Sequence, residues 1–133
     1  MSRGIFDPRN LPPSRPYSPA VVVAGWVHVS GHVPFDRDGS VVGTTAREQT
    51  AQILRNIGYT LESAGASPED IVSTTVYLTE ISDIDQVDEV YREVFGEQTL
   101  PARTTVGIAA LGHPAFRVEI SAIAKLGSAT DRG

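Results

Sequence analysis

Apolar residues recur along two stretches of this chain at the spacing of a helix face. In the first stretch Ile53, Ile57 and Leu61 follow one another every four positions, so they share one side of a helix. Residues 45–48, Thr-Ala-Arg-Glu, form a capping-box pattern that predicts where this helix begins. Residues 84–94 show a similar periodicity and predict a second helix.

Other stretches alternate apolar and polar residues or are rich in β-branched residues, which is typical of strands. These stretches are residues 21–24, 26–33, 71–79, 103–110 and 116–124. The order strand, strand, helix, strand, helix, strand, strand predicts an α+β domain, with a mixed sheet and both helices on one face. We expect the last two strands to pair as a hairpin that turns near His113.

The two ends of the chain lack these patterns. Prolines such as Pro12 and Pro13 block regular backbone pairing, so residues 1–15 are predicted to form an irregular arm. Residues 126–133 are predicted to form a loose tail. With 133 residues in all, the chain is expected to form a single domain.

Alternation along the strands also predicts a sheet face that the helices leave uncovered. The residues expected on this face include Trp26, His28, Ser30, His32, Tyr77, Arg103, Thr105, Gly107, Glu119, Ser121 and Ile123. A face that mixes polar groups with large apolar side chains is typical of a subunit interface. We therefore predict a homo-oligomer whose binding sites lie between subunits.

Composition and charge exclude several classes of function. The 11 basic and 16 acidic residues give a formal net charge of −5, so binding to nucleic acid is not expected. The absence of cysteine excludes disulfides, thiolate metal sites and cysteine nucleophiles. No apolar run is long enough to span a membrane and no apolar signal segment opens the chain, so a cytoplasmic location is expected. Since His28 and His32 would lie about 13 Å apart along a strand, no metal site is predicted.

Two charged residues in the predicted strands are candidates for chemistry. Arg103 offers a planar fork of donors that fits a carboxylate. Glu119 lies in the middle of a strand, where partial burial would let it hold or move a proton near neutral pH. An ion pair between the two is the alternative. The hairpin register weakens that alternative, because it places Glu119 opposite Gly107 and about 13 Å from Arg103.

Three further residues are weaker candidates. Ser30 and Gly31 offer a hydroxyl and an approachable backbone N–H, although the pair also fits a strand end that passes into a turn. Tyr17, in the proline-rich arm, would either cover a pocket or anchor the arm.

The sequence resembles the RidA/YjgF family from Pro16 to Lys125, and the motifs that match include the candidate residues named above. The matching motifs are Pro16-Tyr17-Ser18, Val29-Ser30-Gly31, Val33-Pro34, Gln49-Thr50, Asn56-Ile57, residues 71–79, Pro101-Ala102-Arg103-Thr104 and Val118-Glu119-Ile120. The resemblance implies a chorismate-mutase-like fold and a homotrimer with clefts between neighbouring subunits. It also implies hydrolysis of reactive enamines and imines, such as 2-aminoacrylate, to 2-oxo acids and ammonia, without a metal or a cofactor.

The resemblance assigns roles to individual residues. Arg103 matches the arginine that holds the substrate carboxylate, and Glu119 matches the acidic residue that positions the attacking water. The other matches are pocket residues or positions that lend backbone contacts, namely Tyr17, Ser30, Gly31 and Thr105. We also expect Asp88 to contact the substrate, since it occupies a pocket position where asparagine is typical.

The chain departs from the family pattern at several positions. Beside Asp88, these departures are Arg15, Pro19, His32 and Ser121. Asp88 and His32 would reshape or recharge the pocket, so they bear on the substrate more than on the fold. We expect an imine deaminase. One alternative is a protein that binds 2-oxo acids in the same cleft without turnover, and the other, against which the net charge argues, is an endoribonuclease.

Overall fold

The structure is a computed structural model that describes residues 3–10 and 15–131. Its strands are β1 (Arg3–Ile5), β2 (Ala20–Val23), β3 (Trp26–His32), β4 (Ile71–Leu78), β5 (Ala102–Gly107) and β6 (Val118–Lys125). Its α-helices are α1 (Ala46–Ser63), α2 (Ile84–Phe95) and α3 (Ser128–Asp131), and short 3₁₀ helices precede β4 (Pro68–Asp70) and α2 (Ile81–Asp83). The predicted single α+β unit is thus present in the described residues.

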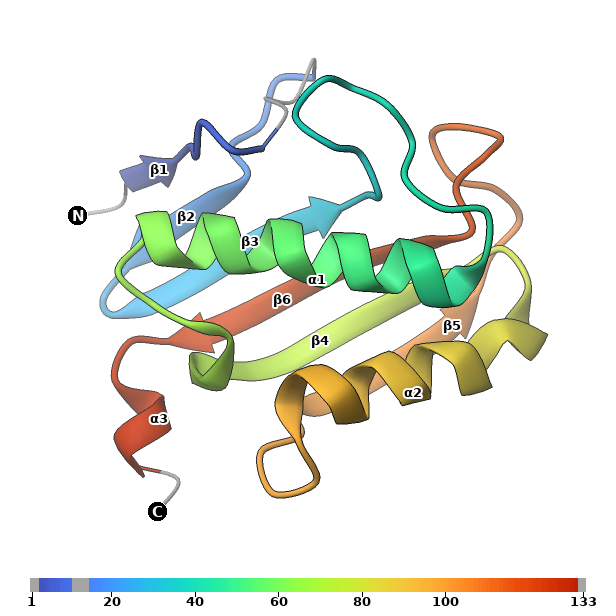
Figure 1. The fold of residues 1–133 in the computed structure, drawn as a ribbon. Coiled ribbons are helices and arrows are strands. Elements are labelled where there is room, and N and C mark those ends of the chain that lie inside the picture. The colour runs from blue at the N-terminus through green and yellow to red at the C-terminus, as the bar shows by residue number, and fades with distance from the viewer. Residues whose placement is uncertain (1–2, 11–14, 132–133) are drawn as a thin grey trace.

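The six strands form one mixed sheet in the order β1-β2-β3-β6-β4-β5. Figure 1 shows α1 and α2 lying side by side across the same face of this sheet. The core lies between the helices and the sheet. Ile53, Ile57 and Leu61 of α1 are completely buried there, as their spacing predicts, and such burial stabilises the fold by roughly 1.5–3 kcal/mol per side chain.

The capping box of α1 is formed as the sequence predicts. The Thr45 hydroxyl accepts a hydrogen bond from the Glu48 backbone N–H at 3.1 Å, and the Glu48 carboxylate accepts one from the Thr45 N–H at 3.2 Å. The helix ends at Ser63, and Gly65 adopts a positive φ of 83° that favours glycine.

The expected hairpin between the last two strands is wrong. β4 lies between them, running parallel to β5 and antiparallel to β6. The reason is that α2 connects β4 to β5 and returns the chain to the end of the sheet where β4 began, so the two strands must be parallel. β6 then pairs with the other side of β4.

The register with β4 also corrects the predicted faces of β5. Arg103 is the partner of Thr74, which is buried beneath α2, so Arg103 lies on the face that the helices cover. Thr105 and Gly107 lie on that same face, and Thr104 and Val106 lie on the opposite one. The prediction had these two sets reversed.

A β-bulge in β3 corrects the predicted face of His32. Val29 is the partner of Ala122 and His32 is the partner of Ile120, so the two residues between Val29 and His32 stand opposite one residue of β6. The extra residue turns His32 to the covered face. Its Nδ1 donates to the Ser30 carbonyl at 2.7 Å, and its Nε2 lies 2.9 Å from the Thr60 hydroxyl of α1.

Both chain ends are more ordered than expected. Residues 3–5 of the predicted irregular arm form β1, because Ile5 is buried in the core and pairs with Ala20. The predicted loose tail contains α3, whose Ser128 hydroxyl and Ala129 N–H bind Asp70 at 2.9 Å each. Pro12, Pro13 and residues 132–133 lie outside the described residues.

The face of the sheet opposite α1 and α2 is called the open face here. It carries the cross-strand pairs Trp26–Lys125, His28–Ile123, Thr75–Ser121 and Tyr77–Glu119. None of these side chains is fully buried within the chain, and Trp26 is 39% exposed. This matches the predicted mixture of polar and large apolar residues on one face.

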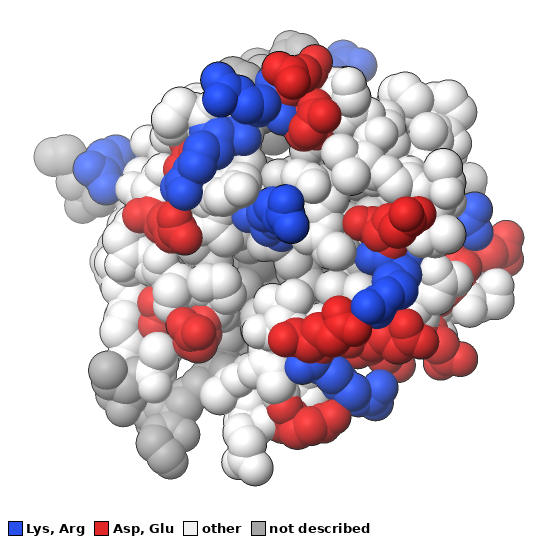
Figure 2. All heavy atoms as spheres, viewed as in Figure 1, with Lys and Arg blue, Asp and Glu red and all other residues white. Residues whose placement is uncertain are grey.

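The helix-covered side of the molecule carries a concentration of acidic residues along α2, visible at the lower right of Figure 2. Asp85, Glu89 and Glu93 are exposed on this helix, and Arg47 of α1 pairs with the last two at 3.2 and 2.6 Å. In the described residues, no helix is both long and apolar enough to cross a membrane.

We predict that His32 makes stability depend on pH. Burial lowers the pKa of His32 from its ordinary 6.5, so below about pH 6.5 the unfolded chain takes up a proton that the folded protein does not. The free energy of unfolding should therefore fall as the pH falls from about 8 to about 5. Denaturant titrations should show a smaller fall for His32→Gln, which keeps hydrogen-bonding groups but does not titrate.

His28→Gln, at an exposed position of the same strand, is the matched control and should behave as the unmodified protein does. An equal pH dependence in all three proteins would contradict the prediction.

Candidate functional site

Glu119 is a half-buried carboxyl group on the open face. It lies near the start of β6, opposite Tyr77 of β4. Burial raises the pKa of Glu119 from its ordinary 4.5, because the charged form loses water. Among the described residues no cation forms an ion pair with it, so its carboxylate remains available as a proton acceptor.

The β-bulge of β3 lies directly against this carboxyl group. A Cβ atom added at Gly31 would overlap the Oε2 atom of Glu119 and would lie 2.9 Å from its Cδ. Only a glycine leaves room for the carboxyl group in this position.

The bulge also fixes the segment that carries Tyr17. The Ser30 hydroxyl donates to the Ser18 carbonyl at 2.7 Å, and the Ser30 backbone N–H donates to the Pro19 carbonyl at 2.8 Å. Tyr17 precedes these two residues and its side chain is half exposed. Gly31 thus lies against Glu119, and Ser30 binds the two residues that follow Tyr17. Tyr17, Ser30, Gly31 and Glu119 are called the Glu119 group here.

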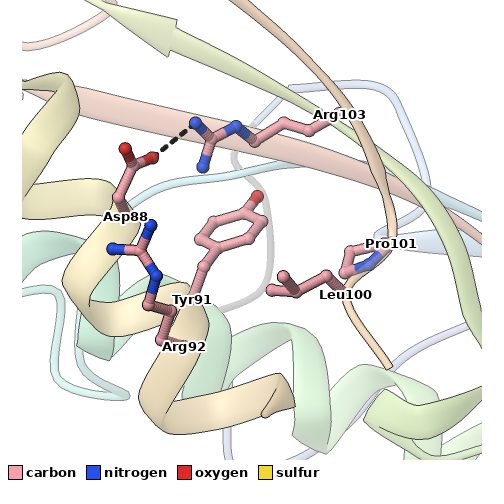
Figure 3. Close-up of a pocket in the computed structure, with 6 residues that line it drawn as sticks. All are labelled: Asp88, Tyr91, Arg92, Leu100, Pro101 and Arg103. Carbon is pink, nitrogen blue, oxygen red and sulfur yellow. Dashed lines mark hydrogen bonds and ion pairs between the residues drawn. The ribbon is translucent and has the colours of Figure 1, made fainter. Parts of the chain in front are cut away.

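A second group lies on the covered face of the sheet. It surrounds a pocket of about 280 Å³ lined by Asp88, Tyr91, Arg92, Leu100, Pro101 and Arg103 (Figure 3). This set is called the Arg103 pocket here. Its residues come from α2, from the segment that follows it and from β5, which the parallel crossover brings together.

Arg103 is held from two sides in this pocket. Its Nη2 donates to the Asp88 Oδ1 at 2.5 Å, and its guanidinium lies over the Tyr91 ring, 4.8 Å from the ring centre. The Tyr91 hydroxyl in turn bonds the buried Thr74 hydroxyl at 2.7 Å. Burial raises the pKa of Tyr91 to about 12, so the ring presents a neutral face to the cation.

Thr105 lies two residues after Arg103 on β5, which is an edge strand of the sheet. Ile108 donates its N–H to Leu78, toward β4. Since backbone groups alternate in direction along a strand, those of Thr105 point to the free edge. Its backbone groups therefore face away from β4.

The structure does not bring the predicted site residues together within one chain. Arg103 lies on the covered face and Glu119 on the open face, so the alternative ion pair between them is wrong. The partner of Arg103 is Asp88, and the platform beneath it is Tyr91. Tyr91 belongs to the predicted helix over residues 84–94, and its spacing of three residues from Asp88 is the signal in the sequence that the two share a helix face.

The described residues contain no cluster of three or more histidine, aspartate or glutamate side chains suited to a metal ion. The histidines are separated by the fold, since His28 is on the open face and His32 on the covered one.

We predict that Gly31→Ala displaces the carboxyl group of Glu119. The added methyl group occupies the space of Oε2, and the flexible glutamate moves toward water, so the pKa of Glu119 should fall back toward 4.5. An NMR titration of the glutamate carboxyl carbons measures this change. Gly112→Ala is the control, because nothing lies within 4 Å of its added Cβ; the same Glu119 pKa in both variants would contradict the prediction.

Comparison with known proteins shows the family of this chain. The sequence model of the family described as Endoribonuclease L-PSP matches residues 8–126. A RutC family protein of Pyrococcus abyssi is 40% identical over 121 residues, which make up 90% of this chain and 94% of that protein. The human 2-iminobutanoate/2-iminopropanoate deaminase is 37% identical over 116 residues, covering 86% of this chain and 83% of that protein.

A solved structure agrees in fold as well. The crystal structure of the Rid family protein YyfA from Yersinia pestis has a TM-score of 0.89 at 34% identity, and the match covers 95% of this chain and all of that chain. The mixed sheet with its two helices on one face is therefore the α+β fold of the YjgF and Rid proteins. Sequence and structure agree over nearly the whole length, and the chain belongs to the RidA/YjgF family.

Proposed function

We propose that this protein hydrolyses small enamines and imines that carry a carboxylate, giving 2-oxo acids and ammonia, at sites between the subunits of a homotrimer. The observation that carries the proposal is that the two candidate chemical groups lie on opposite faces of the sheet. Arg103, on the covered face, offers a cation for a carboxylate, whereas Glu119, on the open face, offers a base. The relation to a human protein named an imine deaminase supports it.

The proposed reaction needs little from the protein beyond position and proton transfer. Arg103 holds the substrate carboxylate through its N–H fork. Glu119 accepts a proton from a water whose oxygen attacks the carbon of the C=N bond. The π electrons pass to the nitrogen, which takes up that proton from Glu119, giving a carbinolamine. That intermediate then loses ammonia and keeps the oxygen as a carbonyl, so imine and water become 2-oxo acid and ammonia. The chemistry requires no metal and no cofactor.

A second copy of the chain is required for this reaction. The Arg103 pocket and the Glu119 group open on opposite sides of one sheet, so they can meet at one ligand only across a subunit boundary. The open face offers the surface for such contact, since it exposes Trp26 and leaves Tyr77 and Ile123 partly exposed. A trimer is the assembly that the family resemblance implies.

The two other functions considered from the sequence have less support. The acidic side of α2 and the net charge of −5 oppose binding to RNA. Binding of a 2-oxo acid without turnover would use the same arginine but leaves the raised pKa of Glu119 without a role.

We predict that Glu119→Gln lowers the rate of ammonia release from freshly generated 2-aminoacrylate by roughly 10²–10⁴-fold, because glutamine cannot accept the proton. In the unmodified protein the rate should fall as the pH falls through the pKa of Glu119, which burial raises above 4.5. Glu80→Gln, at an exposed position, should leave the rate unchanged. Failure of the unmodified protein to accelerate ammonia release, with Arg103→Ala behaving identically, would refute the proposed function.

We also predict that two inactive variants restore activity when mixed. If Arg103→Ala and Glu119→Gln are unfolded together and refolded as mixed assemblies, some sites receive Arg103 from one subunit and Glu119 from the other. Random assembly makes about a quarter of the sites intact. Recovery of about a quarter of the unmodified rate, measured as ammonia release, supports shared sites; no recovery in mixed assemblies that are folded would argue for sites within single subunits.

A further inference from the structure

We propose that Asp88 is a specificity-determining residue, which selects ligands that carry a cationic N–H group beside their carboxylate and disfavours ligands that carry an oxo group there. The inference rests on the proposed function, because it adds a second anchor to the site in which Arg103 holds the carboxylate. It names the protonated imino or amino acid, rather than the 2-oxo acid, as the ligand class that the site prefers.

The ion pair in the Arg103 pocket leaves donors and an acceptor for a ligand. One N–H of the Arg103 fork bonds the Asp88 Oδ1 at 2.5 Å. Among the described residues, no other side chain takes the remaining N–H groups of Arg103 or the second oxygen of Asp88. The two side chains are 20% and 30% exposed, so a ligand can reach both.

The pair presents both charges to the same small space. Figure 3 shows the Asp88 carboxylate and the Arg103 guanidinium pointing toward one another, with the Tyr91 ring beside them. The nearby cation of Arg92 does not offset Asp88, because it pairs with Glu97 at 3.2 Å. A ligand therefore meets a positive and a negative group of equal charge within a pocket of about 280 Å³.

Simple Coulomb reasoning shows which ligands this arrangement favours. A 2-oxo acid brings a carboxylate to Arg103, but Asp88 repels that carboxylate, and the oxo oxygen has no hydrogen to donate. An imino or amino acid in its protonated form brings the same carboxylate together with a cationic N–H group, which can donate to the second oxygen of Asp88. Only the second class of ligand matches both charges of the pair.

The same selectivity makes the site bind the substrate of the proposed reaction more tightly than its product. Hydrolysis replaces the C=N bond by a C=O bond, with the oxygen supplied by water and the nitrogen leaving as ammonia. A donor that faced Asp88 is thereby replaced by an acceptor. Asp88 then favours the substrate over the product and promotes release of the 2-oxo acid.

A purely structural role for Asp88 makes a different prediction. If the carboxylate served only to hold Arg103 in place, its loss would weaken the binding of every carboxylate ligand. If it selects by charge, its loss should move the affinities of the two ligand classes in opposite directions.

The test uses two ligands with the same carbon skeleton, 2-aminobutanoate and 2-oxobutanoate, titrated by calorimetry into the full-length protein. The unmodified protein should bind 2-aminobutanoate more tightly. In Asp88→Asn the affinity for 2-oxobutanoate should rise about tenfold and that for 2-aminobutanoate should fall about tenfold, each about 1.4 kcal/mol. Asp85→Asn, at an exposed position one turn earlier on α2, should change neither affinity.

Arg103→Ala separates this inference from the proposed function. If this variant loses both ligands while Asp88→Asn changes both affinities in the same direction, Arg103 holds carboxylates as proposed and the inference about Asp88 is wrong. If Arg103→Ala binds both ligands unchanged, the role of Arg103 in the proposed function fails. Lack of measurable binding of either ligand to the unmodified protein would also overturn the inference.

Discussion

The position of β4 between β5 and β6 determines where the chemistry of this protein can take place. α2 carries the chain back so that β5 runs parallel to β4, and the register places Arg103 beside Thr74 on the covered face. β6 pairs with the opposite side of β4, where Glu119 stands beside Tyr77 on the open face. The backbone decides the face of each side chain, so no rotation of a side chain can bring the two charges together.

Local sequence signals predicted the elements, but the faces of two strands depended on long-range pairing. The capping box and the apolar spacing of α1 involve neighbouring residues, and both are confirmed. In β5, by contrast, Thr104 and Thr105 are the same residue type, so alternation could not show which one faces the helices. The bulge at Ser30 and Gly31 adds a single residue, and an alternating pattern does not reveal such an addition.

The sequence predicted which residues belong to the candidate site but not how they contact one another. The sequence singled out Arg103 for its fork of donors and Glu119 for its expected burial, and both proved to be partly buried. Arg103 pairs with Asp88, whereas no cation among the described residues pairs with Glu119. The contact of Asp88 with Arg103 could not be predicted, since it depends on α2 packing beside the edge strand. Tyr91 shows the same dependence, because its ring meets the guanidinium only after β5 has been placed.

The bulge in β3 makes the length of this segment as important as its residue types. Deletion of one residue between Val29 and His32 would restore a regular ladder, in which one residue stands opposite Ser121 and His32 remains opposite Ile120 on the covered face. The strand would then lose either Ser30, which binds the Ser18 and Pro19 carbonyls, or Gly31, which leaves room for the Glu119 carboxyl group. Insertions and deletions, which surface loops commonly tolerate, should therefore be excluded from this short stretch even where substitutions are accepted.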